Sequence, residues 1–317
     1  MKKVLLTGYS GFLGTHLVPE LIDDYELVFF GRTAPKEFVC SYFKGNLLKN
    51  TDFLPSLVDC SVVVHAAARV HVMDEKETEP LLAFREVNTY ATIELARQAA
   101  KAGVSRFIFI SSVKVNGERT TGRGPYTVED STAPEDPYGI SKAEAEQELL
   151  DIAKNTGMEV VIIRPPLVYG KGVKANFASL MNLVAKGIPL PFSCINMNKR
   201  SLVSVTNLVD LIITCIDHPK AANQVFLVSD DHDISTAEMV KHMSQALGKS
   251  CRLLPVPLWC YRLVGKLTGK MDVVDRLIGS LQVDITHTKN TLDWTPPQTL
   301  EEGFKETAEA FLLNKDR

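Results

Sequence analysis

The chain has 317 residues, 45% of them hydrophobic and 23% charged, which is an ordinary composition for a globular protein. Its formal net charge is −3, from 35 basic and 38 acidic residues, which excludes the strong positive field of a general nucleic-acid binder. No run approaches the roughly 18 apolar residues of a membrane helix. The apolar start of the chain stops at Thr7-Gly8, which disfavours a signal peptide.

The six cysteines are scattered without a Cys-x-x-Cys pair, and the seven histidines show no metal-ligand spacing. In a chain of this size such cysteines are interpreted as reduced, mostly buried thiols. We therefore expect a cytoplasmic protein with no metal site, no nucleic-acid partner and no integral membrane segment.

The first half of the chain alternates short apolar runs with helical patterns. Strands are predicted over residues 3–6, 27–30, 62–64, 107–110 and 160–163, and helices over residues 12–22, 81–102 and 141–153. Such alternation predicts parallel strands joined by right-handed helical crossovers. Beyond about residue 169, prolines and glycines cluster and helical patterns dominate, as at 235–247 and 300–312.

This pattern predicts an α/β fold with two parts. Residues 1–168 would form a doubly wound parallel sheet that binds a dinucleotide. Residues 169–317 would form a smaller, mixed C-terminal lobe for the substrate, with some residues between 200 and 230 returning to the first part.

A glycine loop follows the first predicted strand and opens the first helix. Its Gly-x-x-Gly-x-x-Gly spacing permits a tight turn, close approach of a pyrophosphate, and close packing of helix on strand. The helix N-terminus adds free N–H groups and the positive end of the helix dipole. Glycines alone would also suit a structural turn, but the strand-loop-helix context favours a dinucleotide site. The residues of this loop assigned to the cofactor are Gly8, Ser10, Gly11, Phe12, Leu13 and Gly14.

The end of the second predicted strand carries no acidic residue. In dinucleotide sites an Asp or Glu about 20 residues beyond the loop hydrogen-bonds the ribose 2′-hydroxyl of NAD. Here Arg32 stands at the strand end, with Thr33 and Lys36 after it. A guanidinium suits the 2′-phosphate of NADP, and it also suits a surface position or stacking on the adenine of NAD. The residues favour NADP slightly over NAD.

Tyr138 and Lys142 are four residues apart and therefore share one face of a helix. A phenol titrates near 10, and bringing its pKa near neutrality takes about three units, or roughly 4 kcal/mol. A nearby ammonium and an oxidised nicotinamide together would supply that stabilisation. The predicted strand 107–110 ends in Ser111-Ser112, at the sheet edge where α/β proteins place ligands. These groups predict a redox site, although serines there are also common in turns and helix caps.

These motifs together resemble those of the extended short-chain dehydrogenases/reductases of the nucleotide-sugar epimerase/dehydratase family. Segments that also match are Gly45-Asn46-Leu47, Val64-His65-Ala66-Ala67, Arg164-Pro165-Pro166, Arg200-Ser201-Leu202-Val203 and Leu292-Asp293-Trp294-Thr295-Pro296. The resemblance spans nearly the whole chain, and it implies a Rossmann sheet with a smaller substrate lobe.

The resemblance implies a role for each matching position. Ser112 would be the active-site hydroxyl, Tyr138 the acid/base, and Lys142 the residue that holds both the tyrosine and the nicotinamide ribose. Two departures stand out: Asn46 replaces a common Asp near the adenine, and Asn116 replaces a common Tyr near the sugar pocket. Besides the loop and Arg32, the implied cofactor residues are Asn46, Leu47, Ala66, Ala67, Ala68, Asn88, Ser111, Tyr138, Lys142 and Pro165.

A nucleotide sugar needs cations for two phosphates and a flat surface for its base. Arg200 is similar in position to the family's phosphate-binding arginine, and Arg276 is a weaker candidate; a surface salt bridge is the alternative for each. Asn176 resembles an asparagine near the diphosphate and would equally suit a helix cap. Leu190 and Phe192 resemble the segment that stacks and pairs with uracil. The predicted substrate-binding residues are thus Ser112, Asn176, Leu190, Phe192, Arg200 and Arg276.

The resemblance implies hydride and proton transfer at C4 of a UDP-sugar, as in polysaccharide biosynthesis. Dehydratases commonly carry Thr-Asp-Glu where this chain has Ser112-Val113-Lys114, so dehydration is disfavoured. Two reactions stay open: a UDP-(N-acetyl)hexose 4-epimerase, or a reductase of a UDP-4-keto-6-deoxy-N-acetylhexosamine. A non-catalytic NADP sensor on the same fold is the alternative from another class. The family also implies a homodimer, formed through the helical segments near 81–102 and 138–152.

Overall fold

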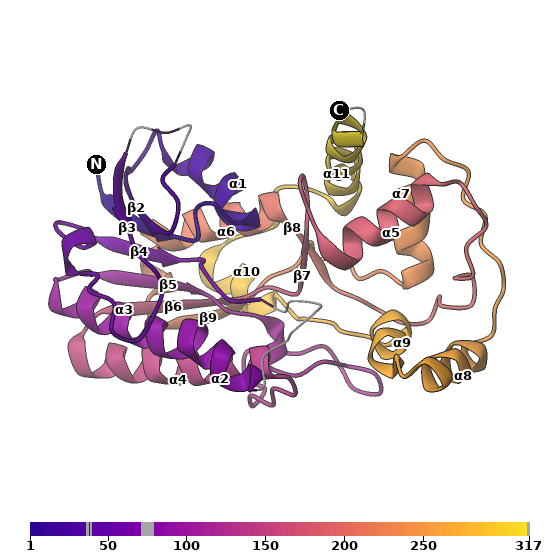
Figure 1. The fold of residues 1–317 in the computed structure, drawn as a ribbon, viewed down its shortest axis with the longest axis horizontal. Helices are drawn as coiled ribbons and strands as arrows, with labels where there is room; N and C mark the ends of the chain where they lie inside the picture. The colour runs from indigo at the N-terminus through magenta and orange to yellow at the C-terminus, as the bar shows by residue number, and fades with distance from the viewer. Residues whose placement is uncertain (36–37, 39, 71–78, 316–317) are drawn as a thin grey trace.

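The computed structural model describes residues 1–35, 38, 40–70 and 79–315. Its first part is a seven-stranded parallel sheet with the strand order β3-β2-β1-β4-β5-β6-β9 (Figure 1). The chain reverses its direction of travel between β1 and β4, which is the switch point where open α/β sheets form a crevice for ligands. The predicted doubly wound α/β sheet with a further lobe is confirmed. The strands are β1 (Lys3–Thr7), β2 (Glu26–Gly31), β3 (Ser41–Lys44), β4 (Val62–His65), β5 (Arg106–Ile110), β6 (Glu159–Arg164) and β9 (Gln224–Leu227).

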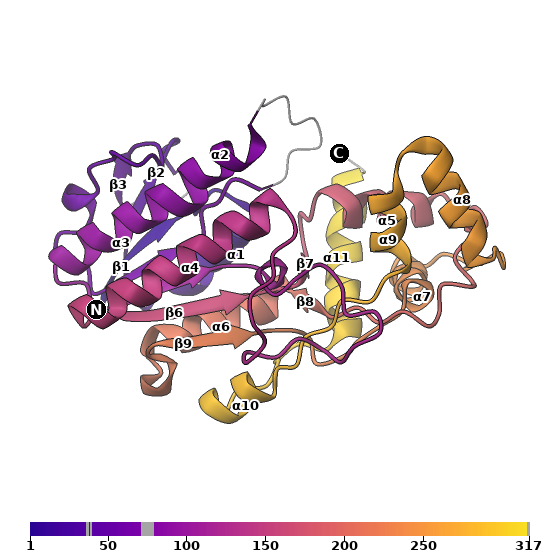
Figure 2. The ribbon, with the colours of Figure 1, turned by 90° about the horizontal axis from the view of Figure 1, so that it is seen from below.

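Helices cover both faces of this sheet (Figure 2). One face carries α2 (Pro80–Arg85), α3 (Ala91–Lys101) and α4 (Pro137–Thr156), with a π-helical stretch joining α2 to α3. The other face carries α1 (Phe12–Leu21) and α6 (Val205–Asp217). Side chains alternate between the two layers, so that Val4 and Leu6 pack in the core under α1 while Leu5 packs in the core under α3. Burial on both faces explains why these strands are continuous apolar runs.

Five of the seven strands were predicted, each within one residue at either end. The sequence pattern missed β3 and β9, the two strands at the sheet edges. β3 consists of four residues that are only half-buried or exposed, so it lacks a clear apolar run. β9 is also four residues long and begins with a half-buried glutamine.

The second part of the molecule packs its own core beside the carboxyl edge of the sheet. Tyr169 and Phe177 stack with ring centroids 5.3 Å apart, and Phe304 completes the cluster. β9 and α6 come from within residues 200–230 and belong to the sheet layers; the boundary at residue 168 stays a prediction. The elements of this part are β7 (Leu167–Tyr169), β8 (Leu202–Ser204), α5 (Ala175–Ala185), α7 (Thr236–Ala246), α8 (Leu258–Thr268), α9 (Met271–Ile278) and α11 (Leu300–Lys315), with α10 (Thr286–Leu292) packed near β9.

Among the residues that the structure describes, none of the helices is both long and apolar enough to span a bilayer.

Candidate active site

The glycine loop is packed too tightly for side chains at two positions. A Cβ on Gly8, which has φ +78°, would lie 2.6 Å from the backbone nitrogen of Ala67. A Cβ on Gly14 would lie 2.2 Å from the Gly8 carbonyl oxygen. Gly11 precedes α1 without a side-chain cap, so the first-turn N–H groups stay available to an anion. The close approach of loop, helix and β4 is the cradle that a pyrophosphate requires.

The end of β2 is shaped by an aromatic side chain that the sequence analysis did not single out. Tyr9 stacks on Phe29 at 4.5 Å, and its hydroxyl donates to the carbonyl of Thr33. Tyr42 donates to the carbonyl of Gly31 at 3.0 Å. Arg32 is exposed between these anchored residues, where it can meet a ligand bound at the strand end. Lys36 lies outside the described residues.

The remaining predicted cofactor residues line the same edge of the sheet. The backbone N–H of Gly45 donates to Gly31, which places exposed Asn46 and half-buried Leu47 beside the end of β2. Residues 66–68 follow β4 directly and are half-buried against the glycine loop. Asn88 is fully buried, and its side-chain amide is hydrogen-bonded within the protein. The amide oxygen accepts the N–H of Arg69, and the amide nitrogen donates to the carbonyl of Arg69 and to the Ser141 hydroxyl. It therefore fixes the loop after β4 to α4.

Ser112 presents its hydroxyl proton at the end of β5. It caps a short 3₁₀ turn, Val113–Val115, by accepting the backbone N–H of Lys114 at 3.3 Å. Because the oxygen accepts this bond, its own proton stays available to donate. The carbonyl of Pro165 accepts the N–H of Val113 at 3.0 Å, so the predicted nicotinamide-side proline holds the same turn.

The first turns of α4 carry Tyr138 and Lys142 against that turn. A Cβ on Gly139 would lie 2.8 Å from the carbonyl oxygen of Lys114, so the helix start and the turn are in contact. Lys142 is 1% exposed, and its ammonium donates to the carbonyl of Ile110 at 2.8 Å. Tyr138 is half-buried and meets the ring of Phe84 edge-on. The structure thus brings the predicted serine, tyrosine and lysine to one edge, without a tyrosine–lysine hydrogen bond.

Burial shifts the pKa values of both Tyr138 and Lys142. It lowers the pKa of Lys142 to about 7, against the opposing effect of the Glu146 carboxylate. Burial, reinforced by the charge of Asp136, raises the pKa of Tyr138 above its ordinary value. A phenolate at Tyr138 therefore needs more positive charge than the protein alone provides, and an oxidised nicotinamide carries such a charge.

A buried ion pair that the sequence analysis missed supports the catalytic helix. Glu146 and Arg164 are 3% and 5% exposed and form a bidentate pair, with nitrogen–oxygen distances of 2.5 and 3.0 Å. Glu146 also accepts a hydrogen bond from the hydroxyl of Ser111, so that hydroxyl proton is already used within the protein. Arg164 donates to Asn116 at 3.1 Å. The only available signal was the spacing of Glu146, four residues beyond Lys142 on the same helix face.

Lys114 stands where the family resemblance implies a carboxylic acid in dehydratases. Its ammonium lies 3.1 Å from Glu118 and pairs more closely with Asp136, the N-cap of α4. The position thus holds an ion-paired ammonium in place of a carboxylic acid, and the absence of dehydration stays a prediction.

The predicted phosphate cations come together in the second part of the molecule. Arg200 donates to the carbonyls of Arg276 and Gly279 at 2.8 and 3.3 Å. Arg276 itself bonds to the carbonyl of Asp272. Within the described part of the chain neither guanidinium has a carboxylate partner. Burial and the neighbouring charge of Arg276 lower the pKa of Arg200, which marks two cations held close together. This arrangement fits an anion with two negative charges.

The segment predicted to bind the base, around Leu190 and Phe192, is buried in the lobe. Leu190 and Phe192 are 4% and 8% exposed and belong to the core of the lobe. The N–H of Leu190 donates to the carbonyl of Arg252, and its own carbonyl accepts from Leu254. Its backbone is therefore already paired, and pairing with a base there stays a prediction. Asn176 lies in the first turn of α5, and its side chain is outside what the structure describes.

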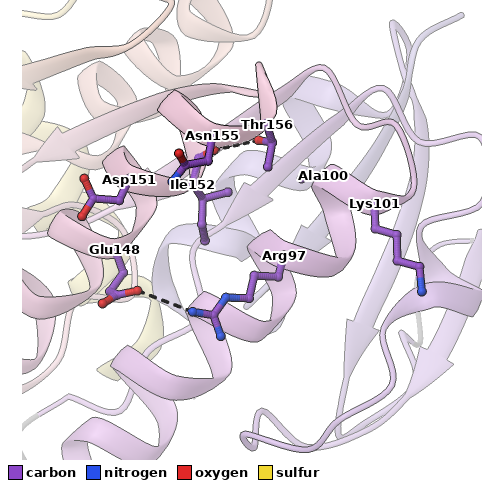
Figure 3. A pocket seen from close by; sticks show the side chains of 8 residues that line it. All are labelled: Arg97, Ala100, Lys101, Glu148, Asp151, Ile152, Asn155 and Thr156. Atoms are coloured by element: carbon purple, nitrogen blue, oxygen red, sulfur yellow. Dashed lines mark hydrogen bonds and ion pairs between the residues drawn. The ribbon is translucent and has the colours of Figure 1, made fainter.

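A separate open groove of about 430 Å³ runs between α3 and α4 (Figure 3). Its lining includes Arg97 and Glu148, 3.6 Å apart, and its floor includes Ile152. The groove lies at the C-terminal ends of both helices, away from Tyr138 and Lys142 at the start of α4. It is a surface feature of the helix pair, and we assign the chemistry to the sheet edge instead. Among the described residues no cluster of metal ligands is present.

Comparisons with known proteins give three findings. The model of the NAD dependent epimerase/dehydratase family matches residues 4–229. The chain is 62% identical to a UDP-glucose 4-epimerase of Vibrio cholerae, over 100% of this chain and 97% of that one. It is 27% identical to the N-acetyl-alpha-D-glucosaminyl-diphospho-ditrans,octacis-undecaprenol 4-epimerase of Escherichia coli O157:H7, over 96% and 93% of the two chains.

Solved structures share the fold across the whole chain. The UDP-glucose 4-epimerase of Thermotoga maritima, solved with UDP-glucose, superposes with a TM-score of 0.79 at 22% identity, covering 99% of each chain. The UDP-glucuronic acid 4-epimerase of Bacillus cereus, solved with NAD, gives 0.78 at 20% identity, covering 98% and 99% of the two chains.

Proposed function

The chain belongs to the NAD-dependent epimerase/dehydratase family of nucleotide-sugar enzymes, and from that premise we propose that it is a UDP-hexose 4-epimerase. The observation that carries this proposal is the 62% identity to a UDP-glucose 4-epimerase along the whole chain. UDP-glucose and UDP-galactose are the substrates we propose first, with their N-acetyl counterparts second.

The residues present fit a bound dinucleotide. The cradle at Gly8 and Gly14 leaves no room for side chains, and the start of α1 offers uncapped N–H groups. NAD, when bound, accepts hydride from the sugar and can return it. We assign the pyrophosphate to Gly11, Phe12 and Leu13, as the loop geometry favours.

The proton chemistry falls to Ser112, Tyr138 and Lys142. Tyr138 takes the proton of the C4 hydroxyl as the C4 hydrogen leaves, and gives it back after the opposite face of the sugar is presented. Ser112 keeps its proton and donates a hydrogen bond to the C4 oxygen, which orients that oxygen. Lys142, which shares a helix face with Tyr138 and whose ammonium bonds to the carbonyl of Ile110, would supply positive charge that stabilises the phenolate.

The substrate's diphosphate belongs at Arg200 and Arg276. The two adjacent guanidinium groups have no carboxylate partner in the part of the chain that the structure describes, which favours an anionic ligand. Hydrogen bonds to backbone carbonyls hold both groups in place. This position anchors the UDP portion while the sugar reaches the sheet edge.

The 4-keto reductase that uses NADPH is the second candidate. It is favoured by one observation: Arg32 is exposed at the end of β2, where an NAD-binding carboxylate commonly stands. The family match supports dependence on NAD, so we propose NAD for the epimerase and leave NADP to this second candidate.

The deciding experiment measures the cofactor and the reaction together. Purified protein is denatured and the released nucleotide identified, and intact protein is incubated with UDP-galactose while UDP-glucose is followed by chromatography. Bound NAD and interconversion support the epimerase. Consumption of NADPH with a UDP-4-keto-6-deoxy-N-acetylhexosamine, without interconversion, overturns it in favour of the reductase. Neither reaction, with cofactor still bound, leaves the non-catalytic sensor.

We also propose a cytoplasmic homodimer formed through α3 and α4, the arrangement that the family resemblance implies. Sedimentation equilibrium at micromolar concentration tests it, because a mass of 35.0 kDa would mean a single chain.

A further inference from the structure

Helix α8 exposes a stripe of large apolar side chains. Trp259, Leu263 and Leu267 are 65%, 50% and 77% exposed, and they recur at every fourth residue, so they lie above one another on one face of the helix. Val264, beside them, is 57% exposed. Single exposed apolar residues are ordinary, but a contiguous stripe on one helix marks a surface that meets another apolar phase.

The stripe faces away from the rest of the protein. Gly265 is the buried residue of α8, and a Cβ there would lie 2.7 Å from Val274 and 3.0 Å from Met271 on α9. At 100° per residue, Leu263 and Leu267 project about 160° away from Gly265. In both views of the molecule α8 lies at the end of the lobe farthest from the sheet (Figures 1 and 2).

The sequence segment that carries this stripe is basic, although the whole chain has a net charge of −3. Residues 249–270 include no Asp or Glu. Among the described residues none of the basic side chains in this segment has a carboxylate partner. Arg262 and Lys266 lie on α8 itself, next to Trp259 on the helix surface. The basic residues of the segment are Lys249, Arg252, Arg262, Lys266 and Lys270.

We propose that α8 docks on the surface of an anionic lipid bilayer. An apolar stripe carrying a tryptophan and flanked by lysine and arginine is the pattern of a helix that lies in the membrane interface without crossing it. The stripe would enter the boundary between headgroups and acyl chains, and the basic residues would meet the anionic headgroups. A second copy of this chain suits the surface less well, because a symmetric contact would bring two uniformly basic segments together.

The docking site is joined to the proposed diphosphate site. Arg252 and Leu254, just before α8, pair with Leu190 through backbone hydrogen bonds of 2.8 Å each. α9, which packs on Gly265, holds Arg200 through the carbonyl of Arg276. The helix that would meet the bilayer is therefore packed directly on the helix that carries Arg276. The docking itself does not depend on which reaction the sheet edge performs.

Vesicle flotation with the full-length protein tests the proposal. Vesicles of phosphatidylcholine with and without about 30% phosphatidylglycerol are compared at low and high salt. We expect the protein to float with anionic vesicles at low salt and about tenfold less with neutral ones. Trp259 fluorescence should shift to the blue on binding, since the other tryptophan, Trp294, is 5% exposed and hydrogen-bonded to Asp210.

Matched variants identify the surface. Leu263→Glu with Leu267→Glu should lower the floated fraction about tenfold, while Leu312→Glu with Leu313→Glu, which adds the same two charges to exposed leucines on α11, should leave it unchanged. Sugar-nucleotide turnover in solution checks that each variant is folded. Absence of flotation at low salt, or equal flotation of the α8 variant, overturns the proposal. Loss of a dimer on Leu267→Glu without vesicle binding would assign the stripe to a second copy instead.

Discussion

The carboxyl edge of the sheet and the C-terminal lobe differ in whether their charged side chains have partners within the protein. At the sheet edge the charged groups are buried and paired: Glu146 with Arg164, and Lys142 with the carbonyl of Ile110. In the lobe, Arg200 and Arg276 lie close together, and neither has a carboxylate partner among the residues that the structure describes. The first region is organised before any ligand arrives, as acid–base chemistry requires. The second carries positive charge that a bound anion would balance, as recognition requires.

The largest expected loss of turnover comes from a substitution at the sheet edge. Tyr138→Phe removes the proposed acid/base while keeping the ring that meets Phe84, so we expect turnover to fall about 10³-fold. Interconversion of UDP-glucose and UDP-galactose gives the rate, and the nucleotide released on denaturation gives cofactor occupancy. Unchanged occupancy with lost turnover would place the defect in chemistry. Full residual activity would rule out the proton-transfer role of Tyr138.

The two regions also differ in how much of them the sequence discloses. Parallel strands end at one edge of a sheet, so the strand ends alone predict that Gly8, Ala66 and Ser112 lie close together. Tyr138 and Lys142 needed only helical spacing. The ion pair of Glu146 with Arg164 could not be foreseen, because the two residues come from different elements and pair through packing. The exposed stripe of α8 was missed since the sequence pattern does not say which face of an amphipathic helix is covered.

In the lobe, the test is whether the two arginines act as one anion site. Arg200→Met or Arg276→Met should lower kcat/KM roughly 10- to 100-fold, the range for losing a charge-assisted hydrogen bond, mainly through KM. Inhibition by UDP should weaken in parallel, since UDP carries the same diphosphate. Arg97→Met, at the groove between α3 and α4, serves as control and should change neither. If both arginine variants bind UDP like the parent protein, the diphosphate lies elsewhere.

The buried ion pair offers a smaller and more selective test of the sheet edge. Glu146→Gln removes a negative charge that raises the pKa of Lys142, so that pKa should fall below about 7. Above it Lys142 loses the charge that stabilises the phenolate, so the alkaline limb of the kcat/KM profile should move to lower pH, with about tenfold less activity near pH 8. The variant should also unfold more easily, because Arg164 stays buried without its partner.

Glu144→Gln separates this effect from a general one. Glu144 lies on the same helix and pairs with Arg85 where both side chains are about one-third exposed. It should leave the pH profile in place. An equal displacement of the alkaline limb in both variants would show that Glu146 has no special link to Lys142.

The smallest effect concerns a buried histidine behind the cofactor edge. His65 is fully buried between Thr7 and Thr92, and burial, with the charge of Lys142, lowers its pKa to about 3. The unfolded chain protonates His65 below about 6.5, whereas the folded protein does so only near 3. The free energy of unfolding should therefore fall as pH drops from 6.5 to 5, by about 1.4 kcal/mol per unit from this residue. Lys142, whose pKa in the folded protein is about 7, is mostly protonated over that range and adds to the slope only near pH 6.5.

Urea unfolding at pH 5, 5.5, 6 and 6.5 measures that slope, in units of about 1.4 kcal/mol per proton taken up on unfolding. His65→Gln should reduce it by nearly one proton, although the variant itself is less stable because the hydroxyls of Thr7 and Thr92 lose their shared partner. His232→Gln, at an exposed position, should leave the slope unchanged. An identical slope in His65→Gln and the parent protein would mean that His65 takes up its proton equally in the folded and unfolded chain. The sheet edge would then be less dry than its buried lysine and ion pair require.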